Sequence, residues 1–265
     1  MDIFSGTILG VIQGLTEFLP ISSSGHLIVA REAFGMGTEQ GLAVDAVLQL
    51  ATILAVLIYF RSDLHRLLRS AVRLVLRRPT EPEARTMLAA IIVGTLPAMI
   101  LGLLLEDQME TVFRSSRLVA VTLIAGSAVM LLGERFARQD RRLSAKRGLI
   151  VGLFQSLALV PGVSRSGATI SGGLLVGLRR DRAARFSFLL AFPIIAGSGL
   201  LKGVELYTVG DAGVWGWPLF TGFLASFGIG LVSIHFLLRF LRHHSLAVFV
   251  VYRLVLAGVI MSGII

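Results

Sequence analysis

Six apolar segments, each long enough to cross a lipid bilayer as a helix, constrain the fold of this chain more than any other feature. A helix rises about 1.5 Å per residue, so about 19 residues cover most of the ~30 Å hydrocarbon layer. Only 15% of the residues are charged and 55% are apolar, whereas soluble domains carry about 25% charged residues. We therefore predict an all-α, polytopic membrane protein. The segments occupy residues 42–60, 87–105, 118–134, 186–204, 217–238 and 246–265.

Three further apolar stretches are too short or too interrupted to span. Residues 3–19 run into a proline, and residues 148–160 and 167–178 are separated by the sequence Pro-Gly-Val-Ser-Arg-Ser. Irregular backbone at membrane depth is tolerated only where protein or a water-filled cavity surrounds it. We therefore predict two re-entrant helix hairpins, at residues 1–40 and 148–178.

Basic residues gather on one side of this arrangement. Nineteen of the 25 Lys and Arg residues lie in four loops that share one side, whereas the opposite loops, 106–117 and 205–216, hold only Arg114 and Arg117. An excess of Lys and Arg marks the cytoplasmic side. The net charge of +9 is therefore a topology signal, which predicts contact with membrane lipids and no nucleic acid. The second hairpin then enters from the cytoplasmic side and the first from the outer side. The four basic loops are 61–86, 135–147, 179–185 and 239–244.

The two hairpins resemble each other. Both place Gly-x3-Gly-x2-Gln ahead of a proline and a Ser-Gly pair, and the copies are offset by 142 residues, as from Gly6 to Gly148. Three predicted spans separate the copies, and an odd number inverts the second copy. We predict a single integral membrane domain over residues 1–265, with inverted-topology repeats at 1–134 and 146–265. Chance similarity between two glycine-rich stretches is the alternative. Inverted repeats with broken helices usually form a binding site where they meet.

Polar side chains cluster around the break in the first hairpin. Gln13 and Glu17 are spaced i and i+4, so they share one helix face. A charge at the bilayer centre costs about 2.5–3.5 kcal/mol, which favours a functional role for Glu17. The alternatives for Glu17 are that it reaches the outer surface, or that it pairs with Arg165 only to hold the hairpins together. The side chains that follow along the chain are Ser22, Ser23, Ser24 and His26. The alternative for the three serines is that they cap a helix.

The break in the second hairpin carries Arg165 among small and hydroxyl residues. A guanidinium donates two parallel hydrogen bonds to a phosphate, and glycine lets the backbone approach closely. Phosphate binding between the two hairpins is therefore favoured. The neighbours of Arg165 are Ser164, Ser166, Gly167 and Thr169, and the chain has no cysteine that could act as a nucleophile or ligand.

Both motifs resemble those of the undecaprenyl-diphosphate phosphatase family of the bacitracin-resistance type. The segment from Gln13 to His26 resembles its Glu/Gln-x3-Glu motif and the Pro-Ile-Ser-Ser-Ser-Gly-His sequence that follows, and Pro161 to Thr169 resembles its second motif. Stretches beginning at Asp45 and Ala184, and the pair Tyr252-Arg253, match as well. Many members carry glutamate where this chain has Gln13, which leaves Glu17 as the only acid on that helix.

The resemblance implies a bacterial inner-membrane enzyme whose site opens to the outer, periplasmic face. It would remove the terminal phosphate of a C55 isoprenyl diphosphate, yielding the lipid carrier of peptidoglycan synthesis, with a divalent cation, Mg²⁺ or Ca²⁺. Glu17 and Gln13 would be the protein ligands of that cation.

We assign catalytic roles to four of these residues. Ser23 is our choice of nucleophile, with Glu17 or His26 as its base, and Arg165 neutralises charge in the transition state. Direct attack by water, positioned by Ser23 and His26, stays open. The substrate-binding residues expected are Gln13, Ser22, Ser24, Ser164, Ser166, Gly167 and Thr169.

One other class of function stays open, and a second is weaker. A transporter or flippase for the isoprenyl phosphate lipid uses the same architecture, whereas a scaffold poorly explains buried Glu, Arg and His. A homodimer also stays open.

Three other polar features within or beside apolar segments are expected to be structural. Asp45 and Gln49 either support the first hairpin or bond within the bundle. Arg253 lies within the last span. The interpretation for Glu134 is an interfacial ion pair with Arg135.

Overall fold

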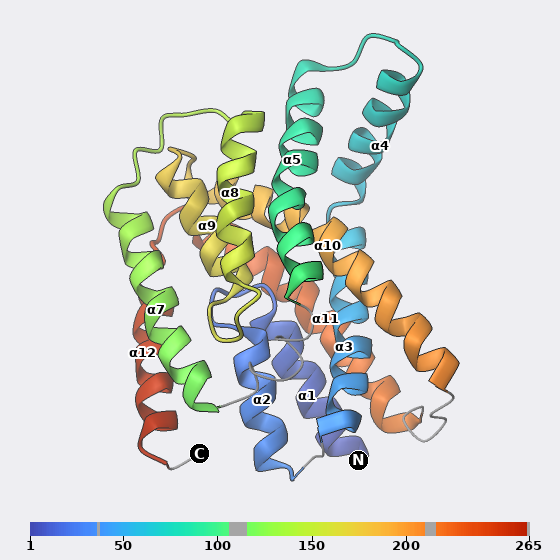
Figure 1. Ribbon diagram of the computed structural model, residues 1–265, viewed down its shortest axis with the longest axis vertical. Helices are drawn as coiled ribbons and strands as arrows, with labels where there is room; N and C mark the ends of the chain where they lie inside the picture. The colour runs from blue at the N-terminus through green and yellow to red at the C-terminus, as the bar shows by residue number, and fades with distance from the viewer. Residues whose placement is uncertain (36–37, 106–115, 210–215, 264–265) are drawn as a thin grey trace.

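The computed structural model describes residues 1–35, 38–105, 116–209 and 216–263, and every regular element within these ranges is a helix (Figure 1). Together with the several apolar helices, this confirms an all-α, multi-pass membrane protein. Most of the expected loop 106–117, and residues 210–215 of the expected loop 205–216, lie outside the described residues.

Two broken hairpins occur where short apolar stretches were expected. The first consists of α1 (Ile3–Thr16) and α2 (Ser23–Ala33), and the second of α8 (Ala145–Leu157) and α9 (Arg165–Leu175). A 14-residue helix such as α1 is only ~21 Å long, too short to cross the membrane. The Asp2 carboxylate starts α1 by accepting a hydrogen bond from the Ser5 amide at 2.7 Å, and this bond lowers the pKa of Asp2.

Among the described residues, three helices are long and apolar enough to span: α5 (Pro82–Leu104), α7 (Ser116–Arg135) and α11 (Trp217–Phe240). A fourth candidate is the pair formed by α3 (Thr38–Tyr59) and α4 (Arg61–Val75), which bends by 79° at its break. The helix α10 (Arg180–Val209) covers the expected span 186–204.

The last span is shorter than expected. The helix α12 (Ala247–Met261) has 15 residues, against the apolar segment 246–265, and a turn follows at residues 262–263. The helix therefore ends before the apolar segment does, since apolar character alone does not continue a helix. Residues 264–265 of that segment lie outside the described residues.

The prediction of a loop over the whole of residues 61–86 is wrong. Residues 61–75 form α4, because apolar residues recur there with helical spacing between the arginines. Charge density alone had marked this stretch as a loop.

Each hairpin packs its first helix against a span from the other half of the chain. α1 contacts α11, and α8 contacts α5. Glycine makes both contacts possible, because a Cβ atom on Gly10 would overlap the Gly222 carbonyl and one on Gly152 would overlap the Gly94 carbonyl. In Figure 1, α1 runs up from the labelled N terminus whereas α8 runs down from the upper loop.

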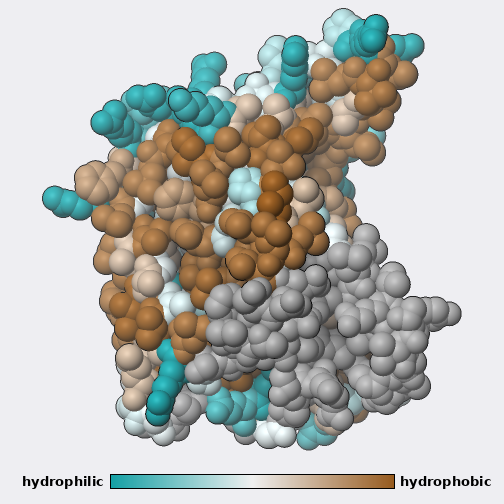
Figure 2. Space-filling view, viewed as in Figure 1, coloured by the Kyte–Doolittle hydropathy of each residue, from teal (hydrophilic) through white to brown (hydrophobic). Residues whose placement is uncertain are grey.

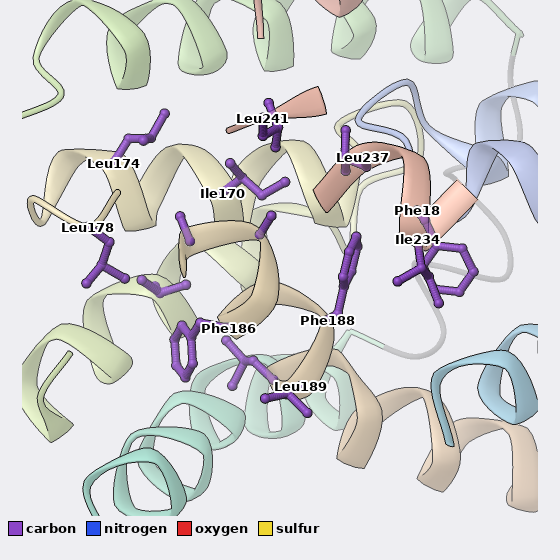
Figure 3. Packing of buried hydrophobic residues seen from close by; sticks show 14 of the residues in the cluster. Phe18, Ile170, Leu174, Leu178, Phe186, Phe188, Leu189, Ile234, Leu237 and Leu241 are labelled. Atoms are coloured by element: carbon purple, nitrogen blue, oxygen red, sulfur yellow. The ribbon is translucent and has the colours of Figure 1, made fainter. Parts of the chain in front are cut away.

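A buried aromatic cluster fixes the end of α1. Phe18 is 1% exposed, and its ring meets Phe188 edge to face with centroids 5.5 Å apart. Figure 3 shows Phe18 beside Ile234, with Phe188 from α10 nearby. Because Phe18 is the residue after Glu17, this packing holds the Glu17 backbone in place.

The interpretation of Glu134 as a partner of Arg135 is wrong. The Glu134 carboxylate accepts hydrogen bonds from Arg180 Nε at 3.0 Å and from the Leu246 backbone amide at 2.8 Å. It thus joins the end of α7 to the starts of α10 and α12. The Arg135 side chain points elsewhere because the side chains of adjacent helical residues leave the helix axis in directions about 100° apart.

Candidate active site

The Glu17 carboxylate joins the two hairpins. Its Oε1 accepts a hydrogen bond from Arg165 Nη2 at 2.7 Å, and its Oε2 accepts one from Ser23 Oγ at 2.7 Å and one from Gln13 Nε2 at 3.1 Å. Glu17 is 7% exposed. The structure therefore brings together four of the residues singled out in the sequence, around one buried charge.

Two serines with the same backbone conformation place Ser23 and Arg165. Ser22 has φ 76° and Ser164 has φ 73°, a left-handed conformation that L-residues rarely adopt. Each serine caps the helix that follows, because Ser22 Oγ accepts from the Gly25 amide at 3.3 Å and Ser164 Oγ from the Gly167 amide at 3.2 Å. Capping was the structural alternative for the run Ser22 to Ser24, and Ser22 follows it. Ser23 and Arg165 consequently occupy equivalent first positions of α2 and α9.

Two polar atoms beside the carboxylate have no hydrogen-bond partner among the described residues. They are Arg165 Nη1, a donor, and Gln13 Oε1, an acceptor, and both are buried. An unsatisfied buried polar atom costs about 1–3 kcal/mol. The site thus offers one cationic donor suited to an anionic oxygen and one carbonyl oxygen suited to a cation.

Ser24 lies at the surface of the site, whereas Ser166 and Thr169 lie inside the protein. The exposed Ser24 hydroxyl contacts Ser22 Oγ at 3.4 Å. Ser166 Oγ donates to the Leu19 carbonyl at 3.2 Å. Thr169 Oγ1 donates to the Arg165 carbonyl at 2.7 Å and lies beside Ser187 Oγ. Their hydroxyls hold the hairpins to each other and to α10.

Gly167 has a steric requirement at the same turn. A Cβ atom there would lie 3.1 Å from Met130 Sδ and 3.3 Å from Ser164 Oγ. A side chain would therefore press on the cap that orients Arg165.

His26 bonds to groups other than Ser23. Its Nδ1 lies 2.7 Å from the Ser22 carbonyl oxygen, and its Nε2 lies 2.7 Å from Tyr252 Oη. The His26 and Tyr252 rings are stacked, with an interplanar angle of 6°. If Nδ1 donates to the carbonyl, Nε2 accepts from the tyrosine hydroxyl. Among the described contacts of Ser23, the one basic partner is Glu17.

Arg253 holds both hairpin breaks from α12. It is fully buried and donates to the Gly162 carbonyl at 2.9 Å, the Pro20 carbonyl at 3.4 Å and Ser127 Oγ at 3.1 Å. A fourth bond, of 3.0 Å, reaches the Leu123 carbonyl. The structural interpretation of Arg253 agrees with these contacts. Its link to the two breaks was not anticipated, because backbone carbonyls leave no mark in a sequence.

Asp45 contacts the first hairpin, which was one of its two interpretations. Its Oδ2 pairs with Arg31 of α2. This pair joins α2 to α3 away from the Glu17 carboxylate.

A metal cluster built only from protein ligands is absent from the described residues, where no group of three or more His, Asp or Glu side chains converges. Glu17 and the free Gln13 Oε1 are nevertheless hard oxygen donors. Mg²⁺ commonly takes one or two such protein ligands and completes its shell with phosphate oxygens and water. The residues present therefore fit a divalent cation that arrives with a phosphorylated substrate.

Comparisons with known proteins match almost the whole chain. The sequence model of the family described as "Bacitracin resistance protein BacA" matches residues 6–259. The undecaprenyl-diphosphatase of Thermobifida fusca is 44% identical over 99% of this chain and 90% of its own length. The enzymes with the same name from Pelobacter propionicus and Idiomarina loihiensis are 42% and 41% identical, over 100% and 98% of this chain and 98% of each relative.

Proposed function

Because the chain belongs to the family of the bacitracin resistance protein BacA, we propose that it hydrolyses undecaprenyl diphosphate to undecaprenyl phosphate and inorganic phosphate. It is a membrane phosphatase, and its product is the lipid carrier that cell-wall synthesis reuses. The observation that carries the chemistry is the Glu17 carboxylate, which bonds a serine hydroxyl of one hairpin and an arginine of the other.

Ser23 is the nucleophile in this proposal. Glu17 Oε2, which accepts the Ser23 hydroxyl at 2.7 Å, takes its proton as Oγ attacks the terminal phosphorus. The bond from phosphorus to the bridging oxygen breaks, and undecaprenyl phosphate leaves. The leaving undecaprenyl phosphate takes up the proton that Glu17 had accepted, so that Glu17 is ionised again. Water then attacks the phosphoserine and transfers a proton to Glu17, the bond from phosphorus to Ser23 Oγ breaks, and inorganic phosphate leaves. Glu17 returns its proton to Oγ, which regenerates the serine.

Arg165 stabilises the transferred phosphoryl group. Its Nη2 stays on Glu17 while the free Nη1 donates to a non-bridging phosphate oxygen. Donors placed in advance in a site that excludes water stabilise developing charge strongly. The N termini of α2 and α9 add partial positive charge beside the same position.

Glu17 is a better candidate than His26 for the base. Both ring nitrogens of His26 already have partners at 2.7 Å, the Ser22 carbonyl and the Tyr252 hydroxyl. This geometry supports a positioning role for His26, in which it holds the strained Ser22 turn that presents Ser23.

A divalent cation, Mg²⁺ or Ca²⁺, completes the proposed site. Glu17 and Gln13 Oε1 would hold it together with substrate oxygens. When bound, it neutralises phosphate charge.

The topology is part of the proposal. The two hairpins enter the bacterial inner membrane from opposite sides as parts of inverted repeats, and the site opens to the periplasmic face with the isoprenyl tail in lipid. The equal offset of α2 and α9, and the opposite directions of α1 and α8 in Figure 1, support this arrangement.

The test is phosphate release from undecaprenyl diphosphate by purified protein in detergent, where transport between compartments gives no signal. We expect release by the wild-type protein, near-complete loss in Ser23→Ala and a smaller loss in Ser24→Ala, because Ser24 does not contact Glu17. Trapping of phosphate on Ser23 supports the covalent route. Substantial turnover by Ser23→Ala contradicts it and favours attack by water. A wild-type protein that releases no phosphate in detergent contradicts the phosphatase assignment.

A further inference from the structure

The helix α4 keeps one apolar edge uncovered. Leu68, Val72 and Val75, spaced i, i+4 and i+7, are 65%, 49% and 83% exposed. The other edge of its apolar face is covered, since Leu67 is buried in the main hydrophobic cluster and α4 packs against α5. The helix is therefore anchored along one edge and unpartnered along the other.

A row of arginines flanks the uncovered edge. Arg66, Arg69 and Arg73 follow each other at helical spacing, Arg77 follows just after the end of the helix, and all four are exposed. The acid of α4, Asp63, is already bound by Arg66 at 3.0 Å and by Arg185 at 2.6 Å. In the described part of the chain no carboxylate pairs with Arg69, Arg73 or Arg77. This face consequently keeps a large positive charge.

The helix α4 turns away from the direction of α3. It leaves α3 at 79° and packs against α5, beside which Figure 1 draws it. The bend is held from α10, because Arg185 bonds both oxygens of Asp63 and its guanidinium lies 6.0 Å from the Phe60 ring. In Figure 2, the projecting part of the molecule where Figure 1 places α4 carries hydrophobic atoms along its side and hydrophilic atoms at its tip.

We propose that α4 is an interfacial helix that binds the anionic leaflet on the basic side of the membrane. Leu68, Val72 and Val75 enter the acyl layer, and the arginines contact phosphate head groups. A basic face beside an apolar edge is the pattern of helices that lie in the interface, and each arginine near an anionic surface contributes about fivefold to the binding equilibrium. The inference rests on the membrane topology proposed above, and it does not depend on the catalytic roles.

The absence of cysteine from the chain allows a direct test. Single variants Leu68→Cys, Val72→Cys and Val75→Cys, with Arg69→Cys and Arg73→Cys as matched positions on the basic face, are spin-labelled and reconstituted in vesicles of phosphatidylcholine with phosphatidylglycerol. We expect a several-fold higher ratio of oxygen to nickel-chelate accessibility at the three apolar positions than at the two basic positions. Equal ratios at all five positions overturn the proposal.

A second experiment tests how much the arginines of this face contribute to lipid binding. The variant Arg69→Gln/Arg73→Gln/Arg77→Gln should lower the ratio measured at Val72→Cys, as should vesicles without phosphatidylglycerol. Arg138→Gln/Arg142→Gln, which removes charge from another basic segment, should leave it unchanged. If the accessibility ratio at Val72→Cys changes neither in vesicles without phosphatidylglycerol nor in the triple arginine variant, binding to an anionic leaflet is contradicted.

Two reference positions distinguish a failure of the interfacial helix from a failure of the membrane topology. Leu96→Cys, on an exposed part of α5, should report the acyl layer, and Arg138→Cys should report water. If Leu96→Cys also reports water, the topology fails. If only the α4 labels report water, the interfacial helix fails. Spin–spin broadening at Val72→Cys would assign this edge to a second copy of the chain and overturn the lipid assignment. Phosphate release by each labelled protein tests the proposed function separately.

Discussion

At the scale of single residues, the hydrogen bond from Arg165 to Glu17 joins positions that lie 148 residues apart in the chain. Both side chains are largely buried, at 14% and 6% exposed. Removing one partner leaves the other charge buried without compensation, which costs about 3–5 kcal/mol. Glu17→Gln and Arg165→Gln should each lower the thermal stability in detergent, as well as abolish phosphate release. The double variant should be destabilised by clearly less than the sum of the two. Additive losses would show that the pair is not coupled.

The two nitrogens of His26 can be tested separately. Asn at this position places an amide donor near the Nδ1 site, and Gln places one near the Nε2 site. If His26 acts by holding the Ser22 carbonyl, His26→Asn should retain more phosphatase activity than His26→Gln. Tyr252→Phe should lose only about fivefold, the value of one hydrogen bond, with the shape of the pH–rate profile unchanged. Equal inactivity of Asn and Gln, with loss of one limb of the pH profile, would instead assign the base to His26.

How much of the site the sequence could predict depends on the kind of partner. The meeting of Glu17 with Ser23 and Arg165 was anticipated, because a lone carboxylate at membrane depth requires a partner and the arginine is one of few available. The bonds of Arg253 to the Gly162 and Pro20 carbonyls were not, because every residue has a carbonyl and only the fold selects which are reached. The hydrogen bond between His26 and Tyr252 was missed for a related reason, since 226 residues separate the two in the chain.

At the scale of the elements, the glycines that seat each hairpin on its span give a matched pair of tests. A methyl group on Gly10 would overlap the Gly222 carbonyl of α11, and one on Gly152 the Gly94 carbonyl of α5. Overpacking costs about 1–3 kcal/mol, so both Gly→Ala variants should unfold at lower temperature in detergent. Gly258→Ala in α12 is the control, because nothing lies within 4 Å of its Cβ position. It should be neutral or stabilising, since alanine favours helices. Equal behaviour of the three variants would contradict the close contacts.

Length and hydropathy predicted the hairpins well and the ends of the helices less well. The 142-residue offset was read from glycines and serines, and α2 (Ser23–Ala33) and α9 (Arg165–Leu175) start and end with that same offset. The helix α4 was missed because its arginines dominated the interpretation of residues 61–75. Its apolar residues at positions 64, 67, 68, 72 and 75 follow a helical period and could have revealed it.

At the scale of the whole molecule, the proposal of inverted repeats rests on the two hairpins entering the membrane from opposite sides. Phe4 in the first turn of α1 and Lys146 in the first turn of α8 are equivalent positions, 142 residues apart, and both are exposed. Because the chain has no cysteine, Phe4→Cys and Lys146→Cys each carry a single reactive thiol. A maleimide that cannot cross membranes should label Phe4→Cys in intact cells, and Lys146→Cys only after the membrane is permeabilised.

This pair of variants decides between two architectures that bring the same residues together. In the inverted arrangement, the first helix of each hairpin starts on its own side and the two breaks meet near the middle of the bilayer, where Glu17 reaches Arg165. If both hairpins entered from one side, both thiols would react from that side, and the basic loops would no longer report orientation. Labelling of both positions in intact cells, or of neither, would therefore contradict the inverted repeats. The contact between Glu17 and Arg165 would then have to form within a site open to one face through two parallel hairpins.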